Sequence, residues 1–374
     1  MPPLARRNLF HDKIRLMVTL TGIIFAVVLI VVQMGLFFGF TTSTKSVLDH
    51  SQADLWITAR NTPYVDVAVG FNERKFYRVL ATPGVAAAQK YIVRWSQWKD
   101  QSGRTESVEV VGVDPNRLMG LPWNVVEGDA SQLKQPHAVM VDEIYKDKLG
   151  VHKVGEWFEV RGYRVKVVGF TRGIRAFTTA PYVFTSFKNA QDFCIFDADQ
   201  TNFVLVKAAA GVDLKQLQAE LQRRLPDNDV YRTQEFAEKT SNYWMFTTGA
   251  GISVLMGAVL GLVVGLVVVT QTIYATTMDH IREFGTLKAM GAPNSYVYRV
   301  IITQAAIAAV MGYSMALVVT FFVTHGGSSA GAPIMVSWRL LVIMFFVTVG
   351  MCITAGVVSI KKVMGLDPAM VFRG

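Results

Sequence analysis

The chain has 374 residues, of which 51% are hydrophobic and only 17% are charged. This balance excludes an ordinary soluble enzyme and predicts an integral membrane protein. The net charge of +9 would by itself fit a nucleic-acid binder, so the positions of the charges have to decide between the two classes.

Four long segments contain no Asp, Glu, Lys or Arg: residues 16–40, 245–277, 300–324 and 340–360. Each is longer than the roughly 20 residues that a helix needs to cross a bilayer, so the sequence predicts four transmembrane helices. The first apolar segment is too long for a signal peptide, and the TTSTKS that follows it lacks the small-residue pattern of a cleavage site. This segment is therefore predicted to remain as a membrane anchor.

The basic residues follow the positive-inside pattern. Residues 41–243 hold 26 Lys and Arg against 24 Asp and Glu, and subtracting these from the totals of 37 and 28 leaves 11 basic and 4 acidic residues elsewhere. Ten of those 11 lie before the first span, in the 278–299 loop and in the tail after residue 360. Both termini and that loop are therefore predicted to be cytoplasmic, with residues 41–243 outside. The basic surplus is a topology signal, and nucleic acid is not expected as a partner.

Residues 1–15 alternate basic and apolar side chains, which predicts an amphipathic elbow helix on the inner membrane surface, near anionic lipid. A solvated positive flank is the alternative. The first span, residues 16–40, contains Gln33, which either contacts another helix or lies near the outer surface.

Residues 41–243 are predicted to form an extracytoplasmic, periplasmic α+β domain. The expected strands are 54–58, 106–113, 157–160, 164–170 and 203–207, and the expected helices are 72–80, 138–149 and 214–225. The predicted fold class is a membrane α-helical protein, with four transmembrane helices in a 1+3 arrangement and a large extracytoplasmic α+β domain.

The sequence offers no catalytic or metal-binding motif. It lacks HExxH, CxxC and GxSxG, and His50, His137 and His152 lack a spacing that would place them on one metal. It also lacks GxxxxGK[ST], so no ATP-binding loop is expected in this chain. Cys194 and Cys352 lie in different regions and predict no disulfide. No catalytic residue, metal or cofactor is therefore assigned.

The tryptophans of the outer segment have two interpretations. They form either an apolar surface for a lipid-like cargo or, as is more common for such residues, the core of the domain. The residues concerned are Trp95, Trp98, Trp123 and Trp157.

The second span is longer than a bilayer requires. Residues 245–277 are 33 uncharged residues. As one helix they would extend about 50 Å, against about 30 Å of hydrocarbon. Residues 244–277 are therefore predicted to form a long second span whose excess length projects outward as a rigid stalk, with Asn242, Tyr243 and Trp244 above the membrane surface.

Three glycines recur at every fourth residue of this span: Gly257, Gly261 and Gly265. Such a stripe lets a second helix approach closely. It serves either packing within the chain or pairing with a second copy of the chain, and pairing is slightly preferred.

Residues 278–295 are predicted to form a cytoplasmic coupling helix. In MDHIREFGTLKAMG, apolar residues recur at helical spacing beside a charged flank, and Gly291 followed by Pro293 is a helix stop. The apolar stripe is Ile281, Phe284, Leu287 and Met290, and the flank is Asp279, Arg282, Glu283 and Lys288. The pattern predicts either a helix that docks on another protein or an ordinary surface helix between two spans.

A third span at 296–325, an outer loop at 326–337, a fourth span at 338–360 and a cytoplasmic tail at 361–374 complete the chain. No span has Asp, Glu, Lys or Arg near its midpoint, which argues against an ion-coupled transporter.

The stretch IREFGTLKAMGAP at 281–293, together with the plan of one span, a large outer insert and three spans, resembles the MacB/FtsX-type ABC transporter permeases. VMVDEIYKDKLGVHKVGEWFEVRGYRVKVVGF at 139–170 is similar to the periplasmic core of that family, and LDPAMVF in the tail also resembles it. Within the family, residues 13–40 look closest to the DevC-like permeases.

The resemblance implies the permease subunit of an exporter that works by mechanotransmission in the bacterial inner (cytoplasmic) membrane. A separate cytoplasmic ATPase would bind ATP and Mg and grip two paired copies of the chain. Motion of the periplasmic domain would then extrude a lipid-like, hydrophobic or peptide cargo. The ATPase-coupling residues that the resemblance implies are Ile281, Arg282, Glu283, Phe284, Gly285, Leu287, Lys288 and Gly291.

The DevC-like similarity adds a periplasmic membrane-fusion adaptor and an outer-membrane channel as implied partners. Two alternatives stay open. One is an FtsX-like relay that activates a periplasmic cell-wall hydrolase, and the other is a membrane-anchored binding protein without an ATPase.

Overall fold

The computed structural model describes residues 13–176, 178, 180–279, 286, 290, 293–328 and 334–364. The chain divides into two compact units. The first, called the membrane unit below, comprises Met1–Gly39, Ile252–Ala330 and Ile334–Gly374, and the second, the outer domain, comprises Phe40–Gly251 and Gly331–Pro333.

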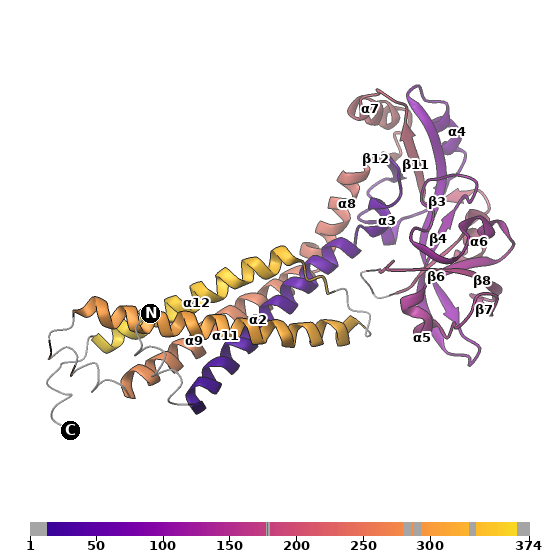
Figure 1. Cartoon of the computed structure of the whole chain (residues 1–374). Helices are drawn as coiled ribbons and strands as arrows, with labels where there is room; N and C mark the ends of the chain where they lie inside the picture. The colour runs from indigo at the N-terminus through magenta and orange to yellow at the C-terminus, as the bar shows by residue number, and fades with distance from the viewer. Residues whose placement is uncertain are drawn as a thin grey trace. The chain divides into compact units, whose positions relative to one another are not determined.

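Four long helices carry the apolar segments (Figure 1): α2 (Lys13–Ser43), α9 (Ala250–Asp279), α11 (Asn294–Ser328) and α12 (Trp338–Met364). Each is long and apolar enough to cross a bilayer, over Leu16–Ser43, Ala250–Asp279, Tyr298–Thr324 and Trp338–Ser359. One helix precedes the outer domain and three follow it, so the predicted 1+3 arrangement is confirmed.

Helix α2 supplies much of the core of the membrane unit. Ile23, Ala26, Val27 and Val31 are buried in one apolar cluster with residues of α9, α11 and α12. Lipid tails are as apolar as leucine, so close fit rather than escape from water has to hold such helices together.

The outer domain is built on a sheet of ten strands (Figure 1). Its strands in spatial order are β12 (Asn228–Arg232), β1 (Leu55–Ala59), β11 (Phe203–Ala208), β3 (Val85–Lys99), β4 (Thr105–Val113), β9 (Tyr182–Ser186), β6 (Ala138–Asp142), β8 (Tyr163–Thr171) and β5 (Val125–Gly128), with β7 (Trp157–Val160) beside β3 and β8. Two short strands, β2 (Phe71–Asn72) and β10 (Gln200–Thr201), pair separately.

Short helices lie between these strands. They are α3 (Ser46–Asp49), α4 (Lys75–Leu80), α5 (Lys146–Leu149), α6 (Phe187–Cys194), α7 (Leu214–Arg224) and α8 (Thr233–Asn242), with 3₁₀ turns η1 (Val65–Val67), η2 (Ala130–Lys134) and η3 (Glu143–Tyr145). Strands and helices are mixed along the chain, and the predicted α+β class is confirmed.

The long strand β3 joins the two halves of the sheet (Figure 1). Its residues 85–91 pair antiparallel with β11, whereas residues 92–99 pair with β4. One half packs its apolar side chains on α4 and α7, and the other half packs on α5 and α6. A third cluster combines residues of both halves with α3 and α8.

Most of the elements expected in the outer domain are present, but the helix predicted over 138–149 is wrong. Residues Ala138–Asp142 form the strand β6, and only Lys146–Leu149 are α-helical. All five residues of β6 are buried because the strand lies between β8 and β9. An inner strand is apolar on both faces, so its sequence does not alternate. The helix predicted from residue 72 begins at Lys75, since Asn72 pairs with Gln200 in the small sheet.

The single uninterrupted helix predicted from residue 245 is also wrong. Helix α8 continues into a π-helical turn, η4 (Tyr243–Thr247), and α9 begins only at Ala250. Between them Gly249 has a φ of +79°, a left-handed conformation that glycine adopts without a steric penalty. The predicted stalk is therefore divided at Gly249 into a segment of the outer domain and a transmembrane helix.

Candidate functional site

The predicted coupling residues lie outside the described residues. These are Ile281, Arg282, Glu283, Phe284, Gly285, Leu287, Lys288 and Gly291. Within the segment the structure describes Thr286 and Met290, with Met290 N–H donating to the carbonyl of Thr286 at 3.0 Å. The assignment of this segment to the ATPase stays a prediction.

The glycine stripe of α9 lies against α2 of the same chain. A Cβ placed on Gly257 would lie 2.6 Å from Gln33 Nε2, and one on Gly265 would lie 2.4 Å from Ala26 Cβ. A Cβ on Gly261 would lie 3.1 Å from Ile30. These distances favour packing within one chain over the preferred use of the stripe for pairing. They also place Gln33 against a neighbouring helix.

Helices α11 and α12 approach α2 and α9 as closely as α2 and α9 approach each other. Met351 Sδ of α12 would lie 3.1 Å from a Cβ on Gly265, and Ile23 of α2 would lie 2.6 Å from one on Gly312 of α11. A glycine at each of these points lets the helix backbones approach where any side chain would separate them.

The polar side chains buried in the described spans are mostly bonded to backbone carbonyls. Thr348 donates to Met344 of its own helix at 2.7 Å, and Ser359 of α12 donates across to Thr270 of α9 at 3.0 Å. The described spans carry Asp279, Arg299 and Arg339 only at or next to their ends. Their interior is therefore built for packing and contains no ionised path for a polar cargo.

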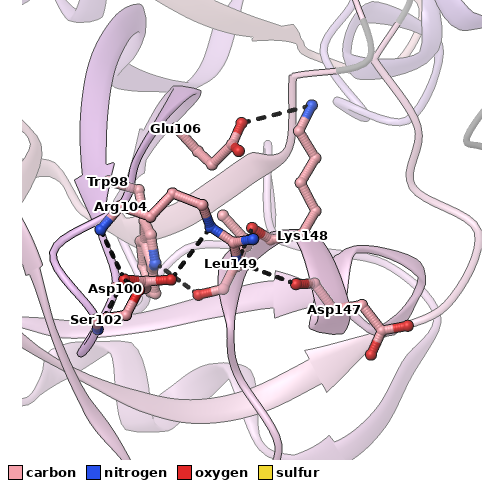
Figure 2. A network of polar contacts seen from close by, with 8 residues as sticks. All are labelled: Trp98, Asp100, Ser102, Arg104, Glu106, Asp147, Lys148 and Leu149. Carbon is pink, nitrogen blue, oxygen red and sulfur yellow. Dashed lines mark hydrogen bonds and ion pairs between the residues drawn. The ribbon is translucent and has the colours of Figure 1, made fainter.

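The turn between β3 and β4 carries a network of polar contacts (Figure 2). Asp100 Oδ1 accepts hydrogen bonds from the Ser102 hydroxyl at 2.6 Å and from the backbone N–H groups of Ser102 and Arg104 at 2.8 and 2.9 Å. Arg104 Nε lies 3.2 Å from Asp100 Oδ2. These contacts, the Ser102 side chain first among them, lower the pKa of Asp100.

The same network fastens the turn to α5 (Figure 2). Trp98 Nε1 donates to the carbonyl of Leu149 at 3.0 Å, and Arg104 Nη2 donates to the carbonyls of Asp147 and Lys148 at 3.4 Å each. The donors and acceptors satisfy one another, so this cluster stabilises the lobe and does not present a reactive group.

A second polar cluster is buried. Asp66 in η1 and Glu109 in β4 are 8% and 1% exposed. Trp244 Nε1 donates to Asp66 Oδ2 at 3.1 Å, and the Thr178 hydroxyl donates to Glu109 Oε1 at 2.9 Å. Tyr64 stacks on Tyr243 with ring centroids 4.2 Å apart. Because Tyr243 and Trp244 lie in η4, these contacts fix the turn that precedes α9 to the outer domain.

Burial changes the protonation of this acid pair. It raises the pKa of Asp66 to about 6, although the Trp244 N–H acts in the opposite direction. Burial, followed by the negative charge of Asp66, holds the pKa of Glu109 well above its usual range. Two carboxyls in one dry site cannot both ionise easily, so the pair retains a proton near neutral pH.

The sequence pattern does not single out this pair. Glu109 shares a strand face with the apolar Val111 and Val113, but Glu106 shares the other face of β4 with the apolar Val108 and Val110, so alternation does not distinguish the two carboxylates. Asp66 lies in an irregular segment, where periodicity gives no information.

The tryptophans have different environments. Trp98 is fully buried, and Trp123 stacks on His50 with ring centroids 4.2 Å apart. Trp157 is 42% exposed and carries the Arg164 guanidinium 4.8 Å from its ring centroid. Trp95 lines a cavity of about 520 Å³, and Trp157 lines one of about 290 Å³.

The two cysteines are free and buried, as expected from the sequence. Burial raises the pKa of the Cys194 thiol to about 12, so it is unreactive. Among the described residues no three His, Cys, Asp or Glu side chains are grouped as metal ligands would be.

The four spans and the α+β outer domain define a multi-pass membrane protein whose polar chemistry lies in the outer domain. Residues 16–224 match the MacB-like periplasmic core domain family, and residues 240–368 match the FtsX-like permease C-terminal family. The first match alone covers more than half of the chain. The chain therefore belongs to the MacB/FtsX-type ABC transporter permeases.

Curated relatives match over their whole length. A Mycobacterium tuberculosis protein described as an uncharacterized ABC transporter permease is 26% identical over 379 residues, covering 99% of this chain and 99% of the relative. A Mycobacterium bovis protein with the same description is 23% identical over 379 residues, again covering 99% of both chains.

Two solved structures are similar to about half of the chain. The periplasmic region of MacB from Actinobacillus actinomycetemcomitans has 10% identity and a TM-score of 0.39, covering 51% of this chain and 94% of that one. The extracellular domain of the noncanonic ABC-type transporter YknZ from Gram-positive bacteria has 14% identity and a TM-score of 0.37, covering 48% of this chain and 99% of that one.

Membership of the family fixes the coarse function. The chain is a non-catalytic transmembrane subunit of an ABC transporter, and ATP binding resides in a partner ATPase subunit. It is a multi-pass membrane protein with a periplasmic domain.

Proposed function

We propose that this permease works by mechanotransmission in an exporter of the bacterial inner membrane. ATP-driven closure of the partner ATPase moves the spans, and α9 passes this motion to the outer domain. The outer domain then pushes onward a lipid-like, hydrophobic or peptide cargo that it takes from the periplasm or the outer leaflet, so the cargo need not cross between the spans.

One observation carries the proposal: α9 connects the two places that have to move together. Its last residue, Asp279, adjoins the predicted coupling segment, and its first residue, Ala250, follows the η4 turn that Trp244 fastens to Asp66. In the described spans the ionisable Asp279, Arg299 and Arg339 lie only at or next to the ends, which also fits work done outside the membrane.

We further propose that two copies of the chain pair. The glycine face of α9 is occupied by α2, but the opposite face leaves large apolar residues exposed. Examples are Met256, Val259, Leu260, Val263 and Val267. A second copy and lipid would share this face. Both termini lie in the cytoplasm in this arrangement, as the charge pattern predicts.

The experiment is a pair of substitutions in the coupling segment, Glu283→Lys and Gly285→Trp. Each is expected to abolish co-purification of the ATPase or to leave it bound without coupled hydrolysis, while the outer domain keeps its protease resistance. Glu127→Lys reverses an exposed charge in the outer domain and serves as the matched control. Unchanged ATPase association and activity in both coupling variants would contradict the proposal.

The same purification separates two finer versions of the function. A co-purifying membrane-fusion adaptor supports tripartite export of the DevC-like kind. A cell-wall hydrolase bound to the outer domain instead would support the FtsX-like relay.

A further inference from the structure

A cavity of about 520 Å³ opens on the outer domain beside the buried acid pair. Its wall comes from the segment around η1, from β3 and from the residues that follow α6; the residues used below are Asp66, Val67, Val69, Arg94, Trp95 and Ile195. The volume lies within the range of about 300–1,000 Å³ in which proteins bind small molecules.

The cavity holds one available positive charge. The Arg94 guanidinium lies 4.5 Å from the centroid of the Phe196 ring, and Arg94 is exposed and has no ion pair among the described residues. Stacking on the ring holds the planar group in place and leaves its N–H edges free to bind an anion. Asp66 also lines the cavity, but its Oδ2 accepts the Trp244 N–H.

The lining of the cavity combines polar and apolar side chains, and three of the apolar ones are exposed beside this charge. Val67, Val69 and Ile195 are 49%, 69% and 67% exposed. Ile195 has a φ of +53°, a conformation that a β-branched residue rarely adopts and that glycine or asparagine usually takes at a helix end. An exposed isoleucine kept in an unfavourable conformation is explained if its side chain contacts something outside the domain.

The wall is fixed before any ligand arrives. A Cβ on Gly70 would lie 2.7 Å from Phe196 Cε1 and 2.9 Å from Gln200 Oε1, so the segment that carries Val67 and Val69 packs tightly on the ring that holds Arg94. The pairing of β2 with β10 fastens the end of the same segment. A preformed site loses little entropy on binding.

We propose that this cavity binds a single-chain anionic amphiphile. Its carboxylate pairs with Arg94, and its hydrocarbon chain lies along Val67, Val69, Trp95 and Ile195. The inference extends the proposed function because it names the chemistry of a molecule held by the outer domain. It does not depend on the ATPase, and its test uses the permease alone.

The probe is a dodecanoic acid that carries a photoreactive diazirine, added to the full chain in lipid nanodiscs and mapped by mass spectrometry after illumination. Label is expected on peptides that contain residues 67–70 and 195–200. Unlabelled dodecanoate should compete for this labelling, whereas dodecanol, which lacks the charge, should not.

Arg94→Gln removes the charge and should reduce labelling about 10-fold, the loss expected for one charge-assisted hydrogen bond. Arg164→Gln is the matched control, because Arg164 is also an exposed arginine stacked on a ring and it lines a smaller cavity of about 290 Å³. Val69→Glu adds a negative charge to the apolar wall and should abolish labelling. Thermal unfolding of each variant checks that the domain is folded.

Three results would overturn the proposal. Labelling could remain unchanged in a folded Arg94→Gln variant, or be confined to lipid-facing residues of the spans. Competition by a short peptide with a free C-terminus that exceeds competition by dodecanoate would assign the cavity to peptides instead. Each of these outcomes leaves the ATPase-coupling experiment, and with it the proposed function, unaffected.

Discussion

The membrane unit and the outer domain differ in the polar groups that they bury. In the described spans the buried hydroxyls mostly donate to backbone carbonyls, and helices approach one another through glycines such as Gly257 and Gly265. The outer domain buries three carboxyls, and two of them, Asp66 and Glu109, lie next to each other. The membrane unit is therefore built for close packing, whereas the groups that respond to protonation or to ligands lie in the outer domain.

The largest expected change in the free energy of unfolding comes from a substitution that disrupts the helix packing of the membrane unit. Gly265→Leu would place side-chain atoms where Ala26 Cβ and Met351 Sδ already lie, 2.4 and 3.1 Å from a Cβ at this position. Overpacking of this kind is expected to lower the free energy of unfolding by about 3 kcal/mol. Thermal unfolding of the purified chain measures it.

Gly350→Leu is the matched control for this substitution. Gly350 lies in α12, and a Cβ built there has nothing within 4 Å. The control should change stability by less than about 0.5 kcal/mol. Equal destabilisation by both substitutions would mean that glycine content, and not the contact with α2, decides the packing.

The next largest effect is a pH dependence of the outer domain. The pKa of Asp66 is raised from 3.8 to about 6 and that of Glu109 is held well above its usual range, so the folded chain holds these protons more tightly than the unfolded chain does. The resulting stability is complete below pH 3.8 and is lost as the pH rises through about 6 and above. Its size is on the order of 1–3 kcal/mol.

The double variant Asp66→Asn, Glu109→Gln isolates this contribution because both groups become neutral at every pH. Between about pH 5 and about pH 8, on either side of the Asp66 pKa of about 6, the melting temperature of the wild type should fall relative to that of the double variant. Parallel curves for the two proteins would show that the pair does not retain a proton.

The smallest effect is expected at the exposed network of the β3–β4 turn. The Arg104 side chain is 54% exposed, so its ion pair with Asp100 is screened by water. Arg104→Ala should therefore cost only about 0.5 kcal/mol in an unfolding measurement. A loss above about 2 kcal/mol would mean that the network of Figure 2 supports the lobe more strongly than its exposure indicates.

The spans and several strands were predictable because hydropathy and strand composition are local signals. The four apolar runs became α2, α9, α11 and α12, and the strands expected at 157–160 and 164–170 are the β7–β8 pair. The features that sequence reasoning missed depend on distant partners. β6 is a strand because β8 and β9 flank it, and no local pattern of residues 138–142 reveals that.

The candidate sites were likewise predictable only where their residues lie close together in the sequence. The coupling segment was found because its apolar stripe, charges and helix stop lie within a few residues. The acid pair joins residues 66 and 109 with residue 244, and the amphiphile cavity joins residues around 67, 94 and 195. Such sites exist only once the chain has folded, so no spacing along the sequence identifies them.

The central claim is that this permease passes the work of a partner ATPase to its outer domain, and the partner is the most direct test. The tagged chain would be purified from its native membranes in mild detergent, and the associated proteins would be identified by mass spectrometry. The account predicts a small soluble ATPase in near-equal amount. No ATPase, under conditions that keep other membrane complexes intact, would contradict the account and leave a membrane-anchored binding protein.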